Sequence, residues 1–385
     1  MKKVKLTGVK VVDVHAHPFK EKLEAQSPVG FLRNLSLSVI PEMFSDLSEV
    51  EKNQPYPGSN MWIQRLLRGM SQYLNCNEDI EAIVHARNEQ SKDFSAYTQK
   101  LFKDVNLQGA IMDFGYPQPP IDREDFEELC DIKVWEISRI EPLMVELSED
   151  YESFEEFISL YRKRLQEDLC KEHVVGLKTI IAYRSGLDVE EIDESAATKE
   201  YETFKKDTRS AVKRLRDYCF HIAMECCTEA DKFMHIHTGI GDGEVVLPKA
   251  SPSYLLDIFR QEKYKNTKVH LVHGGYPWME EAAFIVSILP NVYMDISLQN
   301  PFTAHGVERI MSQVFELAPF DKVMYGSDAF TVPEMNWMGV KIFIENFERV
   351  LNSWVEKDYM DVEKAQYIGE MVLYRNFEKI YNIKL

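Results

Sequence analysis

Five side chains of metal-binding type occur next to small residues along the chain. His15 and His17 form an HAH pair, His237 precedes Thr-Gly, His273 precedes Gly-Gly, and Asp328 lies in the run MYGSDAF. Neutral imidazoles and a carboxylate form a ligand set that suits Zn²⁺, with Mn²⁺, Fe²⁺ or Co²⁺ as alternatives. An isolated HxH pair is equally typical of two hydrogen-bonded histidines. The additional groups favour a metal site.

Each of these side chains ends an apolar run of the kind that forms a buried strand. Eight such runs alternate with amphipathic helical stretches, a pattern typical of parallel strands joined by helical crossovers. Eight units predict an α/β fold that closes into a (β/α)8 TIM-type barrel, with an open doubly wound sheet as the alternative. The runs are KVVDVHAH (10–17), GAIMDFGY (109–116), VWEISRIEPL (134–143), HVVGLKTIIAY (173–183), KFMHIHTG (232–239), KVHLVHGG (268–275), NVYMDIS (291–297) and DKVMYGSDAF (321–330).

Side chains on a barrel strand alternate between the interior and the helix layer. We therefore predict that His15 and His17 point inward together with Asp13. Val12 and Val14 should face the helices. Active sites of such barrels lie at the C-terminal ends of the strands, which is where the HAH pair falls.

The same strand pattern leads to predictions for three further polar residues. His235 shares the face of His237 but lies one layer deeper, so we expect it to support the site rather than bind metal. His270 has the opposite parity to His273 and is expected to face the helices. Asp295 lies at the expected end of the seventh strand. It could support the metal ligands or contact the substrate, and the sequence leaves both open.

Charge and length exclude several function classes. The 385 residues carry 45 Lys plus Arg against 63 Asp plus Glu, a net charge of −18, which argues against nucleic-acid and anionic-membrane partners. No apolar run approaches the roughly 18 residues that span a bilayer, and the start MKKVKL lacks the apolar segment of a signal peptide. We expect a cytoplasmic protein with reduced cysteines and a small-molecule substrate. Assembly into a homo-oligomer is left open.

A long segment separates the first two strands. Residues 18–108 read as helical, with 61–73 and 79–102 the most regular stretches, and Pro55, Pro57 and Gly58 divide the segment into halves. We predict one barrel domain over residues 1–385, with 18–108 as a helical insertion that caps or walls the site.

The ordered motifs HAH, HTG, HGG and GSD resemble those of the amidohydrolase superfamily of metal-dependent hydrolases, from Val11 to about Phe330. More narrowly, GLKTIIAYRSGL, HIHTGIGDG, HGGYPWMEEAAFI, NVYMDIS and MYGSDAF look like the amidohydrolase domain fused to glutamine synthetase in some fungal and plant proteins. This resemblance implies a bound divalent metal, most often Zn²⁺, and hydrolytic chemistry.

Lys178 lies at the expected end of the fourth strand, where the superfamily often carries a lysine. In such relatives this lysine is N-carboxylated and bridges two metals, which would let His237 and His273 hold a second ion. The alternative is a plain ammonium group that binds a substrate carboxylate or forms a salt bridge. One or two ions are both compatible with this ligand set.

The chemistry expected of the site is hydrolysis of an amide-type C–N bond by metal-activated water, with Asp328 as the general base. An ester or lactone is a variant. Superfamily resemblance also extends to decarboxylases that bind one metal through the same residues, and this C–C lyase activity is the main alternative. Uronate-type isomerisation and a non-catalytic scaffold are further alternatives.

Residues near the predicted barrel mouth are candidates for substrate binding. Arg184 and Arg139 could clamp a carboxylate, because a guanidinium can bind it through two nitrogens, or they could pair with nearby acids. Aromatic side chains could wall the pocket; these are Tyr183, Trp278, Tyr276 and Tyr116.

Overall fold

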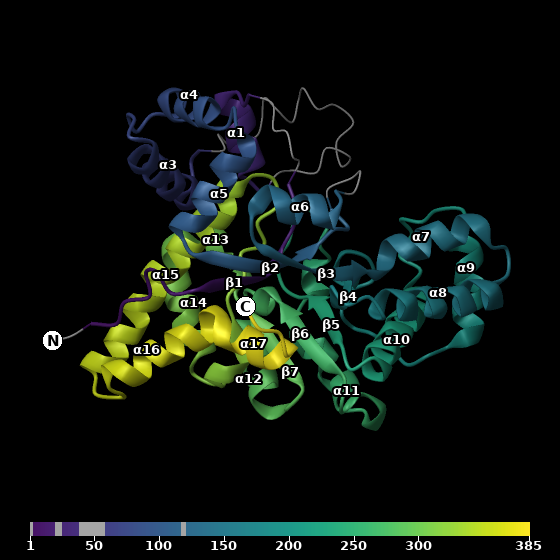
Figure 1. Cartoon of the computed structure of the whole chain (residues 1–385). Helices are drawn as coiled ribbons and strands as arrows, with labels where there is room; N and C mark the ends of the chain where they lie inside the picture. Colours follow the sequence, from purple (N-terminus) through teal and green to yellow (C-terminus); the bar gives the residue numbers. More distant parts are fainter. Residues whose placement is uncertain (1–2, 20–24, 38–57, 117–120) are drawn as a thin grey trace.

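The computed structural model describes residues 3–19, 25–37, 58–116 and 121–385. Eight parallel strands form one sheet in the order β1-β2-β3-β4-β5-β6-β7-β9, surrounded by helices (Figure 1). The predicted TIM-type (β/α)8 barrel is therefore confirmed. The strands are β1 Val11–Ala16, β2 Leu107–Asp113, β3 Lys133–Arg139, β4 Val174–Thr179, β5 Phe233–His237, β6 Lys268–Val272, β7 Val292–Asp295 and β9 Val323–Met324, with the short β8 Ser297–Leu298 following β7.

Backbone hydrogen bonds close the barrel between its first strand and the segment that follows its last. The Val14 amide donates to the Tyr325 carbonyl at 3.0 Å, and the Asp328 amide donates to the His15 carbonyl at 2.8 Å. The His17 amide then donates to the Ala329 carbonyl at 2.7 Å. The hydrogen bonds that close the barrel thus extend beyond the two-residue strand β9 as far as the candidate ligands.

The barrel interior contains a small apolar cluster, and it corrects our prediction for β1. Val12 and Val14 pack with Ile111 of β2, Ile137 of β3 and Met324 of β9. Side chains from strands so far apart in the sheet can meet only inside the barrel. Val12 and Val14 therefore point inward, contrary to the alternation that we predicted.

A bulge explains how β1 can present both the valines and the histidines to the interior. Asp13 pairs with Ala110 and Ala16 with Met112, so three residues of β1 span two residues of β2. An extra residue in a strand shifts the alternation of the side chains that follow it. Alternation alone could not reveal this shift.

The helix α17 (Asn376–Tyr381) lies at the end of the barrel where the strands begin (Figure 1). Its Phe377 is buried in the interior cluster, 4.8 Å from the Trp135 ring of β3. The Tyr381 hydroxyl reaches further in, to the imidazoles of His235 and His270. The C-terminal helix is thus the floor of the barrel.

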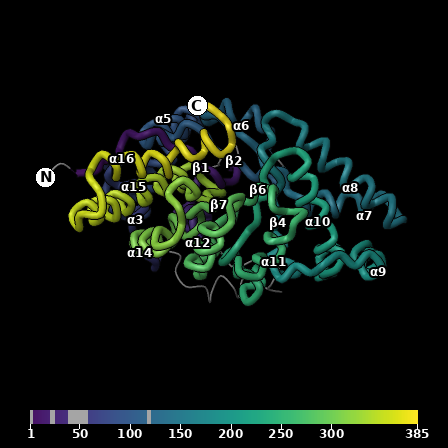
Figure 2. The backbone as a smooth tube through the Cα atoms, turned by 90° about the horizontal axis from the view of Figure 1, so that it is seen from below, coloured from purple at the N-terminus to yellow at the C-terminus, as the bar shows by residue number. Residues whose placement is uncertain are grey.

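The remaining helices form the outer layer (Figure 2). Apolar side chains of the strands pack against them in one extensive core. Within the described ranges, every helix is too short or too polar to cross a membrane. The helices are α1 Pro28–Asn34, α3 Met61–Leu74, α4 Ile80–Gln90, α5 Phe94–Asp104, α6 Arg123–Cys130, α7 Ile140–Asp150, α8 Phe154–Leu169, α9 Glu194–Phe204, α10 Lys213–Glu229, α11 Leu256–Phe259, α12 Met279–Ile288, α13 Gln299–Phe302, α14 Val307–Val314, α15 Pro333–Glu356 and α16 Val362–Glu370.

Helices α1, α3, α4 and α5 lie between β1 and β2. Asn60, Asp79 and Asp93 precede α3, α4 and α5, and each side chain accepts a hydrogen bond from the backbone of the first turn, which is why each helix begins there. Residues 20–24 and 38–57 of the predicted insertion, including Pro55 and Pro57, lie outside the described residues. The domain boundaries stay a prediction.

A buried ion pair joins this segment to α15. The Nε atom of Arg87, on α4, donates to Oε1 of Glu334 at 2.7 Å, and the Tyr97 hydroxyl donates to the same oxygen at 3.0 Å. The side chains of Arg87 and Glu334 are both 0% exposed. Glu334 lies in the first turn of α15, six residues after Asp328, so this pair fixes the helix that follows the site.

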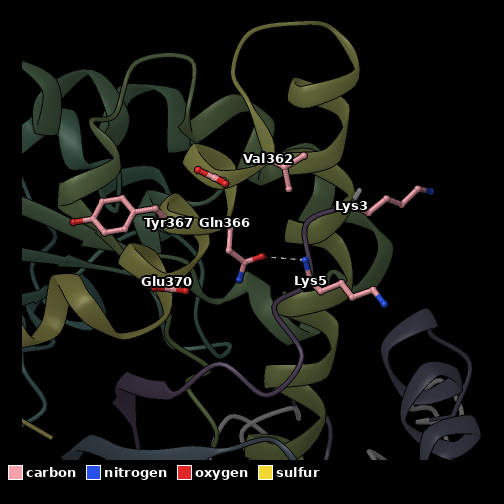
Figure 3. Close-up of a pocket in the computed structure, with 7 residues that line it drawn as sticks. Lys3, Lys5, Val362, Gln366, Tyr367 and Glu370 are labelled. Carbon is pink, nitrogen blue, oxygen red and sulfur yellow. Dashed lines mark hydrogen bonds between the residues drawn. The ribbon is translucent and has the colours of Figure 1, made fainter. Parts of the chain in front are cut away.

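The N-terminal segment runs along α16, where the Lys5 amide donates to Oε1 of Gln366 at 3.1 Å (Figure 3). Lys3, Lys5, Tyr367 and Glu370 line one groove beside α16, and in Figure 3 the two lysine side chains extend away from Tyr367 and Glu370. The residues of this groove are distinct from those of the barrel mouth.

We predict that Arg87→Ala lowers the free energy of unfolding by about 3–5 kcal/mol, because it leaves the Glu334 carboxylate buried without its charge partner. Arg65→Ala is the matched control. Arg65, on α3, pairs with Glu345 of the same helix α15, but these side chains are 28% and 42% exposed, so the loss should be about 1 kcal/mol or less. Urea denaturation followed by fluorescence measures both. Equal losses would contradict this assignment.

Candidate metal centre

A pocket of about 440 Å³ opens at the C-terminal ends of the strands. Its walls come from loops that follow the strands, from Ser36 and Leu37 of the segment after β1, and from Phe330 after β9. It is the one pocket, among those found in the described chain, that contains the predicted ligands. Those that line it are His15, His17, Lys178, His237, His273 and Asp328.

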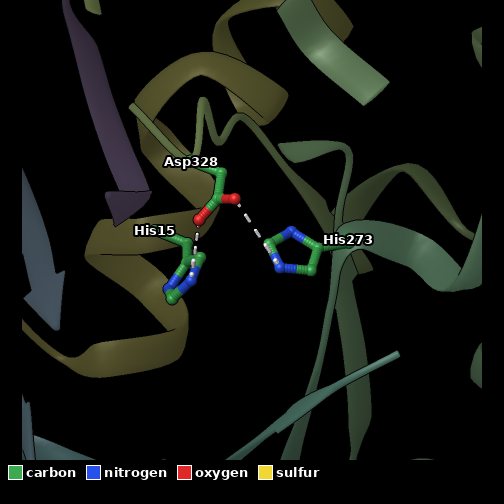
Figure 4. Close-up of side chains that lie close together, drawn as sticks. All are labelled: His15, His273 and Asp328. Carbon is green, nitrogen blue, oxygen red and sulfur yellow. Dashed lines mark ion pairs between the residues drawn. The ribbon is translucent and has the colours of Figure 1, made fainter. Parts of the chain in front are cut away.

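Three imidazoles converge on one carboxylate in this pocket. His15 Nε2 is 3.3 Å and His17 Nε2 is 3.4 Å from Oδ1 of Asp328, and His273 Nε2 is 4.0 Å from Oδ2 (Figure 4). Possible ligand atoms of His15, His273 and Asp328 all lie within 4.8 Å of one another. These atoms come from β1 and from the ends of β6 and β9, so the barrel brings them together.

Hydrogen bonding fixes how His17 faces the carboxylate. Its Nδ1 lies 3.0 Å from the carbonyl oxygen of Asp113, and since a carbonyl only accepts, Nδ1 carries the proton. When the ring is neutral, the lone pair of Nε2 points at Asp328. A lone pair facing a carboxylate oxygen at 3.4 Å is repulsive unless a cation lies between them, and a divalent metal fits this donor set.

Burial supports the same protonation state for the other two imidazoles. The pKa values of His15 and His273 are held well below the usual range, first by burial and then by the positive charges around them. Both rings are therefore neutral. Neutral imidazole is the form that binds metal.

Two of the converging residues adopt backbone conformations that are rare for side-chain-bearing residues. The φ angles of His273 and Asp328 are 70° and 57°. Such conformations persist only where surrounding contacts enforce them, and they are concentrated at functional sites. Here the His273 amide donates to Oδ1 of Asp295 at 3.0 Å, and the Asp328 amide is held by the His15 carbonyl.

Asp13 joins the two ends of the barrel beneath these ligands. Its Oδ1 accepts from the amide of Ser327 at 3.0 Å and from that of His15 at 3.2 Å, while Oδ2 accepts from the Ser327 hydroxyl. Burial raises the pKa of Asp13 to about 7 despite these donors. Asp13 thus holds the neighbours of both His15 and Asp328.

His237 and Lys178 occupy the opposite side of the group. His237 Nε2 is 3.0 Å from the Ile240 carbonyl, so it donates there and leaves Nδ1 with the lone pair. The ring centre of His237 is 4.4 Å from that of His273. Lys178 Nζ is 3.2 Å from His15 Nε2, and burial lowers the pKa of Lys178 to about 8.

The loop that follows His237 needs its glycine. Gly239 has a φ of 79°, and a Cβ there would lie 2.2 Å from the Tyr276 carbonyl oxygen. The Gly239 amide also donates to the Ala250 carbonyl at 2.8 Å. This explains the HTG motif as a requirement of close packing.

Both candidate arginines line the pocket, and each is paired with an acid. Arg139 donates through Nε and Nη2 to Oδ2 of Asp113, at 3.0 and 2.6 Å. Burial would raise the pKa of Asp113, but Arg139 and neighbouring positive groups outweigh it and lower the pKa to about 2. Arg184 donates through Nη1 to Oε2 of Glu244 and to the Tyr183 carbonyl, both at 3.0 Å.

The predicted aromatic walls are found in two places. Tyr183 and Tyr116 line the pocket, and the Tyr183 ring lies 4.6 Å from that of His237. Trp278 and Tyr276 are not among the described lining residues. They pack against the apolar core instead, because the chain turns away from the barrel axis after the HGG motif.

The interior below His273 corrects the prediction for His270. His270 is fully buried and lies inside the barrel, where its Nε2 is 2.8 Å from Oδ2 of Asp295. His273 is outside β6, at positive φ, so the parity between the two histidines is lost. The ring of His235 lies 4.6 Å from that of His270, tilted by 31°, and His235 is two residues before His237 on β5.

Some residues of the pocket were not singled out from the sequence. Asp242 and Glu244 lie at the mouth, and Ser36 and Leu37 come from the segment after β1. Asp113 carries a usable signal because it ends strand β2, as His237 ends β5. The others lie in loops without such a signal.

Both the sequence and the fold of the chain are similar to those of known proteins. The family model described as amidohydrolase matches residues 204–383, which include His237, His273 and Asp328. Protein fluG of Emericella nidulans is 25% identical over 244 residues, which is 60% of this chain. Over residues 204–383 the chain is therefore similar to the amidohydrolase family. The match spans 28% of the length of the fluG protein.

Solved structures share the fold of this chain. A Lactobacillus casei protein assigned as a metal-dependent hydrolase has a TM-score of 0.86 and 23% identity, with 99% of this chain and 98% of that one covered. Uronate isomerase of Thermotoga maritima has a TM-score of 0.67 and 15% identity, with 97% and 95% covered. Both likenesses concern the fold.

We predict that the purified protein contains at least one divalent ion per chain and that His17→Ala loses most of it, because one of the converging lone pairs is removed. The core does not depend on the ion, so the circular dichroism spectrum should be preserved. His85→Ala, at an exposed histidine, is the control. Elemental analysis of both variants measures the ion, and an unchanged metal content in His17→Ala would refute the ligand assignment.

Proposed function

We propose that the protein is a metal-dependent hydrolase that cleaves an amide-type C–N bond of a small, carboxylated substrate. The convergence of His15, His17 and His273 on the Asp328 carboxylate, at the base of a pocket, carries this proposal. A bound divalent ion supplies two effects, a lower pKa for a water molecule and polarisation of a carbonyl group. Zn²⁺ suits the donor set, with Mn²⁺, Fe²⁺ and Co²⁺ as alternatives.

Asp328 is the proton-transfer group of this proposal. Its side chain is 13% exposed and faces the pocket, so it can reach both the attacking water and the leaving nitrogen. As a carboxylate it accepts a proton from water and passes that proton to the nitrogen as the C–N bond breaks. The His15 carbonyl holds the backbone of Asp328 in place during this exchange.

Arg184 is the proposed site for the substrate carboxylate. Its bonds to Glu244 and to the Tyr183 carbonyl are made by Nη1, which leaves Nη2 without a partner among the described residues, and the side chain lines the pocket and is 25% exposed. Arg139 is less suited, because two of its nitrogens already bind Asp113. Tyr183 forms the wall between Arg184 and His237.

N-carboxylation of Lys178 is a further element of the proposal. The Nζ lone pair would attack CO₂ and lose a proton, which turns the amine into an anionic oxygen ligand beside His15. His237 and His273 would then complete a second ion site. ¹³C NMR after incubation with labelled bicarbonate detects the carbamate, and its absence would leave a single-ion centre.

A substrate screen tests the reaction class. The metal-loaded protein is incubated with carboxylated amides, aromatic and enoic acids, and uronates, before and after chelation. Chelation-sensitive release of amine is the expected result. Release of CO₂ would identify a decarboxylase and interconversion of uronates an isomerase, while amide turnover that is indifferent to chelation would contradict the proposal.

We predict that Asp328→Asn lowers kcat by about two to four orders of magnitude, because the amide keeps the volume but cannot accept the proton. Steady-state kinetics on the best amide substrate measure the loss. Elemental analysis and circular dichroism must show a folded protein that still contains metal. A kcat near that of the wild type would exclude Asp328 as the base.

We predict that Arg184→Lys raises KM about tenfold for acidic substrates, because lysine keeps the charge but loses the planar donor pair. Neutral analogues should change little. Glu244→Gln gives the matched opposite test: it releases Arg184 from its partner and should lower KM for acidic substrates. Equal effects of Arg184→Lys on both substrate types would show that Arg184 only braces its loop.

A further inference from the structure

A chain of hydrogen-bonded side chains runs through the barrel interior from the candidate metal centre to the floor helix α17. We call it the inner column; it consists of His273, Ser297, Asp295, His270 and Tyr381. The distances are 2.7 Å from His273 Nδ1 to Ser297 Oγ, 2.5 Å from Ser297 Oγ to Asp295 Oδ1, 2.8 Å from Asp295 Oδ2 to His270 Nε2, and 2.9 Å from His270 Nδ1 to the Tyr381 hydroxyl.

The upper half of the inner column admits one arrangement of protons while Asp295 is ionised. A carboxylate only accepts, so the Ser297 hydroxyl donates to it. The lone pairs of that hydroxyl are then left for His273, whose Nδ1 must donate. His273 therefore carries its proton on Nδ1, and the lone pair of Nε2 faces Asp328.

The lower half is ordered in the same way. His270 Nε2 donates to Asp295, so in the neutral ring Nδ1 accepts from the Tyr381 hydroxyl. The oxygen of Tyr381 in turn lies 3.2 Å from His235 Nε2, which can donate to it. Tyr381 thus donates from α17 to the last imidazole of the column and holds that ring in the orientation in which its Nε2 reaches Asp295.

Burial restricts the hydrogen bonds of these side chains to partners within the protein. The side chains of His235, His270, Asp295 and Ser297 are 0% exposed. Water therefore cannot readily replace a missing partner, and a buried polar group that loses its hydrogen bond destabilises the arrangement that contains it. Within the described residues, the Asp295 carboxylate also accepts from the amides of His273 and Ser297, which ties the column to the backbone at the mouth.

We propose that Tyr381 is a positioning residue for the metal centre: through His270, Asp295 and Ser297 it fixes the tautomer and orientation of His273 as a ligand. This inference rests on the proposed function in that it takes His273 to bind the ion. His17 receives the same kind of fixation from a single backbone carbonyl, that of Asp113. His273 instead depends on a chain of side chains that ends in the floor helix.

Four variants test the inner column. Ser297→Ala removes the acceptor of His273, Tyr381→Phe removes the floor hydroxyl, and a double variant combines them. Tyr264→Phe is the matched control, because the Tyr264 hydroxyl makes a buried hydrogen bond of 2.6 Å to Nδ1 of a histidine, His221, away from the barrel mouth. All four should lose some thermal stability, so the melting temperature of the metal-free protein is recorded for each.

The first readout is ¹⁵N NMR of metal-free protein labelled at histidine, which reports the tautomer without any metal. We expect the Nδ1–H form of His273 in the wild type and in Tyr264→Phe. A mixture of tautomers is expected in Ser297→Ala and in Tyr381→Phe. The wild-type tautomer in Tyr381→Phe would overturn the proposal whether or not the protein is a hydrolase.

The second readout is the affinity for Zn²⁺, measured by competition with a chelator. Ser297→Ala should bind about 10- to 100-fold more weakly, the range typical of losing a partner of a metal-binding histidine. Tyr381→Phe should bind several-fold more weakly, and the double variant no more weakly than Ser297→Ala alone, since residues in one chain of hydrogen bonds are not additive. Tyr264→Phe should bind as the wild type does.

Two outcomes separate the failure of this inference from that of the proposed function. Wild-type affinity in Tyr381→Phe, or strictly additive losses in the double variant, would overturn the inner column while leaving a metal-dependent enzyme. A wild-type protein that does not bind Zn²⁺ or another divalent ion would overturn the ligand role of His273 and the proposed function together.

Discussion

The closure of the barrel between β1 and the segment after β9 is the constraint on which the site depends. The Asp328 amide donates to the His15 carbonyl, and the Asp13 carboxylate bonds to Ser327, so the HAH pair and the candidate base are held by the same few hydrogen bonds. The bulge in β1 is part of this closure, because it turns both histidines inward above the interior valines. Strand pairing, rather than the flexibility of side chains, therefore sets the distances at the centre.

The charged groups around the centre are balanced by neighbouring groups of the protein. Arg139 is neutralised by Asp113 and Arg184 is paired with Glu244, so the strongest local cations are committed to protein carboxylates. The imidazoles are held neutral by burial, and the Asp328 carboxylate stands among their lone pairs. A cation at this point would satisfy all of these groups at once, whereas an anion would have to displace Glu244 or approach its far side.

The fold and the convergence of the candidate ligands on one pocket followed from the sequence, because four of the apolar runs carry a motif and parallel strands present their ends at one face of a barrel. The orientation of Val12, Val14 and His270 did not follow, since a bulge and a residue at positive φ shift an alternation that the letters alone show as regular. The partners of the arginines and the contact of Tyr381 with His270 also lay beyond reach. They join positions 26, 60 and 111 residues apart on different elements, and periodicity within one element carries no signal for such contacts.

The contact between Asp13 and Ser327 spans 314 positions of the chain, and this separation has a consequence for biosynthesis. A ribosome that adds about 5–20 residues per second needs roughly 15–60 s to travel from one to the other. For that time the nascent chain displays its HAH pair without the carboxylate that faces it in the finished barrel. A metal ion that meets the growing chain can find two imidazoles but not the full set, so tight and selective loading belongs to the released protein.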